Sequence, residues 1–555
     1  MFRVVRRALA TEATGGRVEM VCRALYDVIA KRGPLPYRRL WEIVAYEKVA
    51  DPTGPLARIA SGRMLKYLLE ELKRSNQVTV VKSEPANDAA GFVYRTATVV
   101  LVRALSLVIV DMITELVLGA ALRAALMAAG SAEMLSNAVE LVGPTTSYRR
   151  VQEALYLNAR HLSIYDGDVF HQPPLVFELF SALESIGLRA LVPGVFIAID
   201  VIIAVLFHEI ARMNNTFNFP LTIKVPNRAE NMNSSSGMEY VVLLVYLFNP
   251  LTVLSCAAMS TSLLTHLFAV MSIYLAFRGR PTLLGFCIAA ATYLELHSAF
   301  LIIPGVLLLH FGSVVQPMPT TAISTDHDAD RIPDLPRFAV NPRILTCIIS
   351  ALLWYPVLVV LSTAVYGSWE WISHSYKYVF AVMDLSPNIG VFWYFETEIF
   401  NRFRTFFLVC FHAHVLVYLI PLTVRFWHNP LFLGFVCAQL ANLFQSYPVL
   451  GDYGISYPLL LTQWAILKKM RPIIPVYVGL LISCTLGHMT WFLWIHAGSG
   501  NANFYYNQTL VWGFCNGFLV IEAVSAVRTL YTLADPSPPP TEHDGADQSK
   551  APVAR

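Results

Sequence analysis

Residues 190–208 read ALVPGVFIAIDVIIAVLFH, an apolar run that contains one carboxylate, Asp200, and no lysine or arginine. About 20 apolar residues in a helix span the hydrocarbon core of a bilayer. The run therefore predicts a membrane-spanning helix with an acid inside the membrane. Similar runs recur to the end of the chain and predict about twelve spans. They are 99–129 (only partly in the membrane), 190–208, 239–256, 261–277, 281–295, 297–312, 343–366, 403–424, 430–446, 455–467, 472–494 and 508–531.

The composition of the 555-residue chain agrees with a polytopic membrane protein. Hydrophobic residues make up 55% of it and charged residues only 14%, whereas soluble domains carry about 25% charged residues. Residues 1–97 hold 17 Lys and Arg against 10 Asp and Glu, and residues 98–555 hold 24 against 28. This balance excludes an ordinary soluble enzyme, and it argues against nucleic-acid binding by the membrane part.

The chain divides into three predicted parts. They are a soluble, basic, mainly helical segment at 1–97, an all-α polytopic domain at 98–534 and a disordered tail at 535–555. The first part opens with MFRVVRRALATEATGG, which has the composition of a mitochondrial presequence. Because such a leader conflicts with a polytopic chain, we expect a fusion or a gene-model error, with Met112 as an alternative start. Within the segment 1–97, helix patterns lie at 18–31, 38–50 and 55–74, and a strand pattern lies at 78–82.

The charges of the short loops predict the orientation in the membrane. If 174–187 lies along the interface, the loops on one side carry twelve Lys and Arg, and those opposite carry two, Lys377 and Arg402. The positive-inside rule then places the basic loops and both termini in the cytosol. The opposite, luminal side contains the loops 130–189, 367–402, 446–454 and 495–507.

Three luminal segments, 384–396, 445–453 and 496–507, mix aromatic residues with amides and acids. An interfacial aromatic belt explains the Trp and Tyr residues without any ligand. It leaves the Asn, Asp and Gln residues unexplained, whereas a sugar needs both kinds of side chain. Both interpretations stay open. The candidate ligands of a glycan or headgroup are Asp384, Asn388, Trp393, Tyr394, Glu396, Asp452, Asn501 and Asn503.

Two further places contain candidate polar groups. Asp200 is either a functional intramembrane carboxylate or a hydrogen-bond partner of a Ser, Thr or Tyr on a neighbouring helix. Asp166 and Asp168, near His171, could hold a divalent metal, but Asp-Gly-Asp before two prolines is more typical of an exposed turn. The eight cysteines contain no CxxC pair and the fourteen histidines are dispersed. We therefore expect no metal site and no cofactor.

Several separated motifs make the chain similar to a known family. They are GPTTSYRRVQEAL (143–155), SIYDGDVFHQPPL (163–175), LFNPLTVLSCAAMSTS (247–262), DLSPNIGVFWYFETEIF (384–400), SYPVLGDYG (446–454) and WIHAGSGNANFYY (494–506). They resemble, in order, the PIG-U family, the U subunits of glycosylphosphatidylinositol (GPI) transamidase, over about 112–531. The resemblance implies a noncatalytic, multi-pass subunit in the endoplasmic reticulum (ER) membrane. Its implied ligand is the GPI lipid or the attachment signal, and its partners include a caspase-like catalytic subunit.

The resemblance also implies the GT-C architecture of the mannosyltransferases of the GPI pathway. Those enzymes carry a catalytic Asp-x-Asp-Tyr soon after the first span. The corresponding stretch here is Thr145-Thr146-Ser147-Tyr148, which has no carboxylate, and the Asp166/Asp168 pair falls in a later region. A binding and scaffolding subunit is thus favoured, and the alternative is a mannosyltransferase that uses a dolichol-phosphate sugar.

Overall fold

The structure is a computed structural model that describes residues 97–216, 237–313, 341–471 and 474–534, with three short strands and a few isolated residues before them. The chain forms two compact units, Met1–Glu115 and Leu116–Arg555. The division falls inside helix α5 (Ala97–Ala128).

The first unit contains a three-stranded antiparallel sheet in the order β1-β3-β2. Its strands are β1 (Leu35–Pro36), β2 (Val78–Lys82) and β3 (Phe92–Thr96). The strand predicted at 78–82 is confirmed. The prediction of a mainly helical segment missed β3, whose sequence FVYRT is rich in strand-forming residues. The helices predicted at 18–31, 38–50 and 55–74 lie almost wholly outside the described residues.

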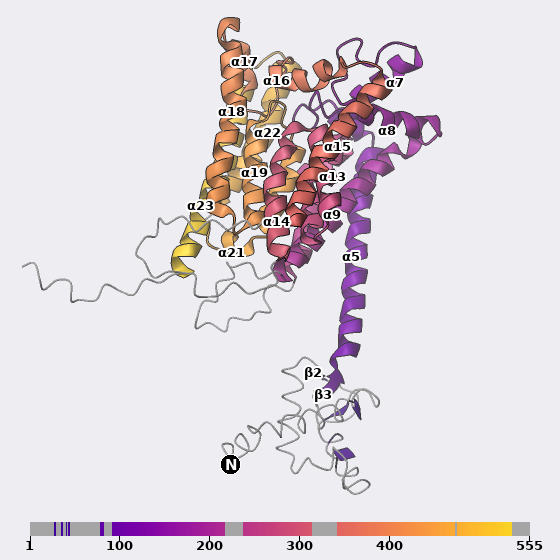
Figure 1. The fold of residues 1–555 in the computed structure, drawn as a ribbon, viewed down its shortest axis with the longest axis vertical. Coiled ribbons are helices and arrows are strands. Elements are labelled where there is room, and N and C mark those ends of the chain that lie inside the picture. The colour runs from indigo at the N-terminus through magenta and orange to yellow at the C-terminus, as the bar shows by residue number, and fades with distance from the viewer. Residues whose placement is uncertain are drawn as a thin grey trace, which may run out of the picture. The chain divides into compact units, whose positions relative to one another are not determined.

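The regular elements of the second unit, over its described residues, are helices (Figure 1). Its first half contains α6 (Ser131–Leu135), α7 (Tyr148–Ala159), α8 (Pro174–Ser185), η2 (Arg189–Leu191), α9 (Val192–Thr216), α10 (Met238–Phe248), α11 (Pro250–Ala257), α12 (Ser262–Phe277), α13 (Pro281–Leu294), η4 (Leu296–Leu301) and α14 (Ile302–Ser313). Its second half contains α15 (Pro342–Tyr366), η5 (Ser373–Lys377), α16 (Tyr378–Ala381), α17 (Trp393–Glu398), α18 (Asn401–Phe426), α19 (Pro430–Phe444), η6 (Leu450–Asp452), α20 (Tyr453–Leu461), α21 (Trp464–Leu467), α22 (Ile474–Ile495) and α23 (Ala502–Ala534).

Five helices of the described residues are long and apolar enough to cross a membrane, and a sixth span is possible if α10 and α11 form one bent helix. The five lie at Arg189–Asn214, Pro342–Tyr366, Asn401–Phe426, Ile474–Ile495 and Ala502–Leu530. Each overlaps a predicted span. The predicted spans 261–277, 281–295 and 430–446 each match one apolar helix that is shorter than 18 residues, whereas 239–256 and 455–467 are each divided between two helices. At one break, the Asn249 side chain caps α11, Pro250 begins it, and the axis bends by 45°.

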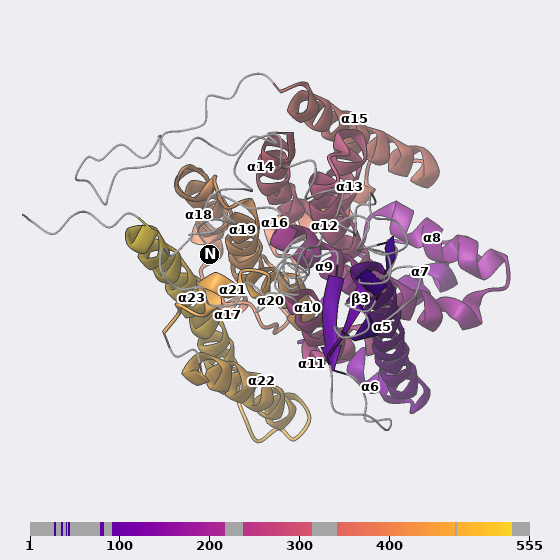
Figure 2. The same ribbon diagram turned by 90° about the horizontal axis from the view of Figure 1, so that it is seen from below.

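The long helices stand side by side (Figure 1). Viewed along their axes, α12, α19 and α20 lie inside the bundle, and α15 and α22 lie at its outside (Figure 2). Small residues allow close packing: a Cβ added to Gly285 of α13 would lie 2.5 Å from the Cys347 carbonyl oxygen of α15. The short helices α7, α16 and α17 gather at one end of the bundle, called the cavity end below (Figure 1).

Candidate functional site

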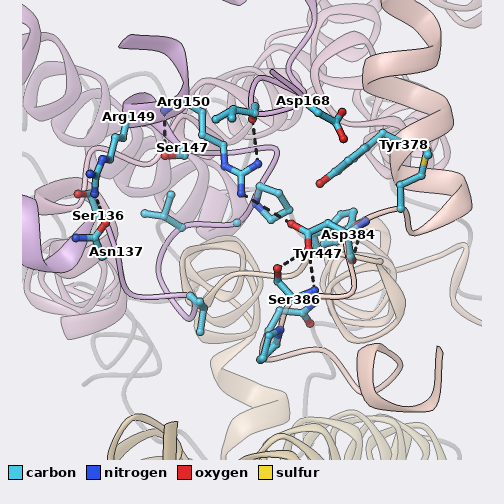
Figure 3. Close-up of a pocket in the computed structure, with 18 of the residues that line it drawn as sticks. Ser136, Asn137, Ser147, Arg149, Arg150, Asp168, Tyr378, Asp384, Ser386 and Tyr447 are labelled. Atoms are coloured by element: carbon cyan, nitrogen blue, oxygen red, sulfur yellow. Dashed lines mark hydrogen bonds and ion pairs between the residues drawn. The ribbon is translucent and has the colours of Figure 1, made fainter. Parts of the chain in front are cut away.

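A polar cavity of about 640 Å³ lies at the cavity end. Its walls come from three parts of the chain: the region 136–153 with Asp168 and Val169, the segment 378–388, and Tyr447. Figure 3 shows the side chains that point toward this space. The charged residues of the lining are Arg149, Arg150, Glu153, Asp168 and Asp384. The cavity thus contains both signs of charge.

Asp384 is held in place by its neighbours. The Tyr447 hydroxyl accepts a hydrogen bond from the Asp384 N–H and donates one to the Asp384 carbonyl oxygen, each at 3.0 Å. Burial raises the pKa of Tyr447, so the hydroxyl keeps its proton. Asp384 Oδ1 accepts from the Ser386 N–H at 2.8 Å. Oδ2 faces the cavity, which Tyr378 also lines, and it lies 3.8 Å from Arg150 Nη2 (Figure 3).

Arg150 projects from the first turn of α7, which Ser147 caps by accepting from the Arg150 N–H at 3.4 Å. One end of its guanidinium is fixed, because Nη1 donates to the Val169 carbonyl oxygen at 3.0 Å. The 3.8 Å separation from Asp384 is too long for a hydrogen bond. The two side chains are 29% and 20% exposed. This ion pair is therefore open to a ligand.

The stretch Thr145 to Ser147 lies beside this cavity and is held by main-chain contacts. The Thr146 carbonyl oxygen accepts from the Thr261 N–H at 2.8 Å, and the Ser147 carbonyl oxygen accepts from Gln172 Nε2 at 2.9 Å. The Thr261 contact docks the stretch on the turn between α11 and α12, and the Gln172 contact joins it to the segment before α8. They give the stretch a structural role.

A second feature is an aromatic cluster, which we call the aromatic lip: Trp393, Tyr394, Trp494, Tyr505 and Tyr506. The Trp393 ring centroid lies 5.7 Å from that of Tyr506, 6.0 Å from Tyr505 and 6.4 Å from Trp494. The rings of Tyr394 and Tyr506 are 4.7 Å apart. The Tyr506 hydroxyl donates to the Val391 carbonyl oxygen at 3.0 Å. The lip thus joins α17 to the ends of α22 and α23 that face it.

Glu396 lies next to the lip but is buried. Its Oε2 is 3.7 Å from Arg404 Nε, and its two carboxylate oxygens have no hydrogen-bond partner among the described residues. Burial raises the pKa of Glu396, an effect that Arg404 partly offsets. A buried carboxylate is poorly placed to meet a ligand.

The remaining predicted site residues do not form one cluster. Asp452 is buried, accepts from the Val449 N–H at 3.0 Å, and lies 3.2 Å from His266 Nε2. Asn388 lines the cavity but is buried, accepting from the Gly390 N–H at 2.8 Å and donating to the Ser446 carbonyl oxygen at 3.4 Å. Asn501 and Asn503 are exposed at the start of α23. The predicted set therefore divides between the cavity, the lip and the core.

The comparisons with known proteins concern the region that builds these features. A family described as the GPI transamidase subunit PIG-U matches residues 117–512. The chain belongs to the PIG-U family. It is 32% identical to the GPI-anchor transamidase component PIGU of Homo sapiens over 406 residues, which covers 72% of this chain and 89% of that protein. It is 27% identical to the GPI transamidase component GAB1 of Saccharomyces cerevisiae over 395 residues, covering 70% and 87%.

The region that the PIG-U family shares also contains a buried ion pair. Asp200 of α9 pairs through Oδ2 with Arg123 Nε of α5, and its Oδ1 accepts from the Tyr246 hydroxyl of α10 at 2.6 Å. Arg123 Nη1 donates to the Leu247 carbonyl oxygen at 2.8 Å. The tyrosine was among the partners that the sequence predicted. The arginine was not, since it lies 77 residues away in a run assigned only partly to the membrane.

The stretch from Asp166 to His171 forms a turn. Asp166 Oδ2 accepts from the Ser163 N–H at 3.0 Å, and Gly167 and Asp168 have φ of +92° and +54°. His171 is buried, with its ring nitrogens 3.0 Å from the His374 carbonyl oxygen and 3.1 Å from that of Asp168. Burial lowers the pKa of His171. Across the described residues, no three His, Cys, Asp or Glu side chains are arranged to hold a metal ion.

Proposed function

We propose that this chain is the noncatalytic U subunit of a GPI transamidase in the ER membrane, and that its cavity end binds the glycan or headgroup of the GPI lipid. The proposal rests on the position of the family motifs around one cavity. Segments of the motifs 143–155, 163–175, 384–400 and 446–454 meet around one polar cavity. The names of the relatives, which are GPI transamidase components, support the choice of complex and of ligand.

The residues beside the cavity support the noncatalytic role. The stretch at 145–147 offers two threonines and a serine where a mannosyltransferase needs carboxylates. The carbonyl oxygens of Thr146 and Ser147 accept hydrogen bonds from the main chain and from the Gln172 amide. The reaction would then belong to a caspase-like partner, and this chain would hold the lipid and support the complex.

The finer architecture is part of the proposal. We expect about twelve spans in a GT-C arrangement, with the cavity end in the ER lumen and both termini in the cytosol. Residues 1–97 would be a separate soluble segment and 535–555 a disordered tail. Protease access in sealed ER vesicles tests the orientation. A tag between Lys468 and Arg471 is expected to be cleaved, and a protected tag would reverse the topology.

Within the lip, Trp393 and Tyr505 are buried. The half-buried rings of Tyr394, Trp494 and Tyr506 supply the apolar faces that sugar rings need, while Asn501 and Asn503 at the start of α23 offer exposed amides. Tyr394 is half-buried, so its removal changes the surface more than the core. We therefore choose Tyr394→Ala as the test variant. The matched control is Trp464→Ala, an exposed aromatic residue on α21 outside both the lip and the cavity lining.

The experiment measures photo-crosslinking of a GPI analogue to the complex, and co-purification of the partner subunits. Tyr394→Ala is expected to lower crosslinking several-fold with partners retained, and the control is expected to change neither. A variant that loses partners while crosslinking per complex stays constant would assign the lip to a subunit interface.

A further inference from the structure

Glycan binding leaves the charges of the cavity unexplained. Sugar hydroxyls are neutral, and amides and single carboxylates satisfy them. The cavity instead gathers two guanidinium groups, Arg149 and Arg150, and three carboxylates, Glu153, Asp168 and Asp384. Its volume of about 640 Å³ lies within the usual range for small-molecule sites.

The central pair is fixed on both sides yet stays apart. Val169 holds one nitrogen of Arg150, while Ser386 and Tyr447 hold Asp384. The facing atoms, Nη2 and Oδ2, are separated by 3.8 Å. Part-exposed pairs of this kind contribute little stability. A ligand with its own charges can therefore replace this contact at small cost.

The surrounding charges exclude simpler ligands. A lone anion would meet three carboxylates at the cavity wall, and a divalent cation would meet two guanidinium groups. Within the described residues no metal-binding group of side chains is present. A ligand that carries one negative and one positive group a few bonds apart can pair with both the guanidinium groups and the carboxylates of the lining.

We propose that this cavity binds a phosphoethanolamine group, with the phosphate on Arg150 and the primary ammonium on Asp384. Guanidinium is suited to phosphate because its N–H groups match two phosphate oxygens. The carboxylate accepts from the ammonium through Oδ2, the oxygen that Ser386 leaves open. Arg149 also lines the cavity, but its side chain turns toward Asn137 Oδ1, on the far side of Arg150 from Asp384 (Figure 3).

Two lipids carry this chemistry: a GPI lipid, through its ethanolamine phosphates, and bulk phosphatidylethanolamine. The GPI source rests on the function proposed above, whereas the recognition chemistry does not. The remaining volume of the cavity leaves room for the attached sugar or glycerol.

The test uses the purified transamidase complex with the full chain, in phosphatidylcholine nanodiscs. Three soluble trimannosyl glycans serve as probes: one ends in phosphoethanolamine, one in phosphate without the amine, and one in a free hydroxyl. Binding is measured with the wild type, Arg150→Gln, Arg150→Lys and Asp384→Asn. Arg189→Gln is the matched control, because Arg189 forms an exposed pair with Glu184 outside the cavity lining. Thermal melting checks that each variant is folded.

The wild type is expected to bind the phosphoethanolamine glycan at least tenfold more tightly than the other two. Asp384→Asn should remove the advantage of the amine, and Arg150→Gln should remove the advantage of the phosphate. Arg150→Lys should retain part of it, and the control should behave as the wild type. A wild type that binds all three probes equally overturns the inference. Folded Arg150→Gln and Asp384→Asn variants that keep full discrimination also overturn it.

The source is decided by adding phosphatidylethanolamine to the nanodiscs. Competition with the probe would support the recognition chemistry and assign the cavity to bulk lipid, and the absence of competition would assign it to GPI. Different results would refute the phosphoethanolamine site and the glycan-binding function proposed above. Equal binding of all three glycans refutes the phosphoethanolamine site but leaves glycan binding at the lip. Free phosphoethanolamine serves as a fourth probe: if it binds while the hydroxyl-terminated glycan does not, the glycan site alone is refuted.

Discussion

Two Arg–Asp pairs of this chain differ in burial and in the distance between their charged atoms. Arg123 and Asp200 have no exposed surface and are joined by a direct hydrogen bond, with Tyr246 on the second carboxylate oxygen. Arg150 and Asp384 are part-exposed and 3.8 Å apart at the wall of a cavity. The same residue types therefore join helices α5, α9 and α10 in the core, whereas at the cavity wall they leave charged groups accessible to a ligand.

The difference comes from the surroundings. An isolated charge in the bilayer interior is costly, so the first pair must satisfy itself and the nearby backbone. Water and ligands reach the second pair, and its charges need no complete internal partner. Substitutions at the buried Arg123–Asp200 pair should therefore cost more stability than substitutions at the part-exposed Arg150–Asp384 pair.

Removal of Arg123 is expected to destabilise the chain most. Arg123→Leu leaves Asp200 charged and buried with only Tyr246 beside it, which costs about 3 to 5 kcal/mol. Thermal melting and yield of the purified protein measure the loss. Arg123→Leu with Asp200→Leu should recover most of it, because the uncompensated charge is gone. If Arg123→Leu alone melts like the wild type, the buried charge of Asp200 does not depend on Arg123.

Asn388 tests a residue that lies at the cavity but is buried. Asn388→Ala removes the acceptor for the Gly390 N–H and a donor to the Ser446 carbonyl oxygen. An unpaired buried polar group costs about 1 to 3 kcal/mol. We expect a lower melting temperature together with slower anchor attachment. Slower attachment at unchanged stability would instead make Asn388 a direct ligand contact.

Asp384→Asn is the counterpart of Asp200→Asn. The amide oxygen can still accept from the Ser386 N–H, and the lost charge faces an open pair worth less than about 1 kcal/mol. Side-by-side melting should show a much larger shift for Asp200→Asn. Equal shifts for the two variants would remove the distinction between the pairs.

The smallest effect is expected for Asp166→Asn combined with Asp168→Asn. Asn adopts the positive φ of Asp168 as readily as Asp does, so stability should change by no more than about 0.5 kcal/mol. Anchor attachment in complemented cells should remain mostly intact. Loss of attachment with normal assembly would support a metal at this turn.

Much of the fold follows from local sequence. The runs around Asp200 and at 343–366, 403–424, 472–494 and 508–531 are long and apolar, and each became a helix of spanning length. The strand at 78–82 follows from its β-branched residues. The breaks within other runs were missed, because hydropathy averages over a window and does not register a turn such as that at Asn249 and Pro250.

The sequence by itself determined the membrane class, the PIG-U resemblance and the residue types at the cavity end. Only the tertiary structure decided which of those residues act together. Asp452 and Glu396 look like Asp384 in sequence, yet they are buried, while Asp384 faces a cavity with Arg150 from a segment more than 200 residues away. The physical reason is that exposure and charge pairing depend on which helix ends meet. That contact is set by packing across the bundle and leaves no periodic pattern in the chain.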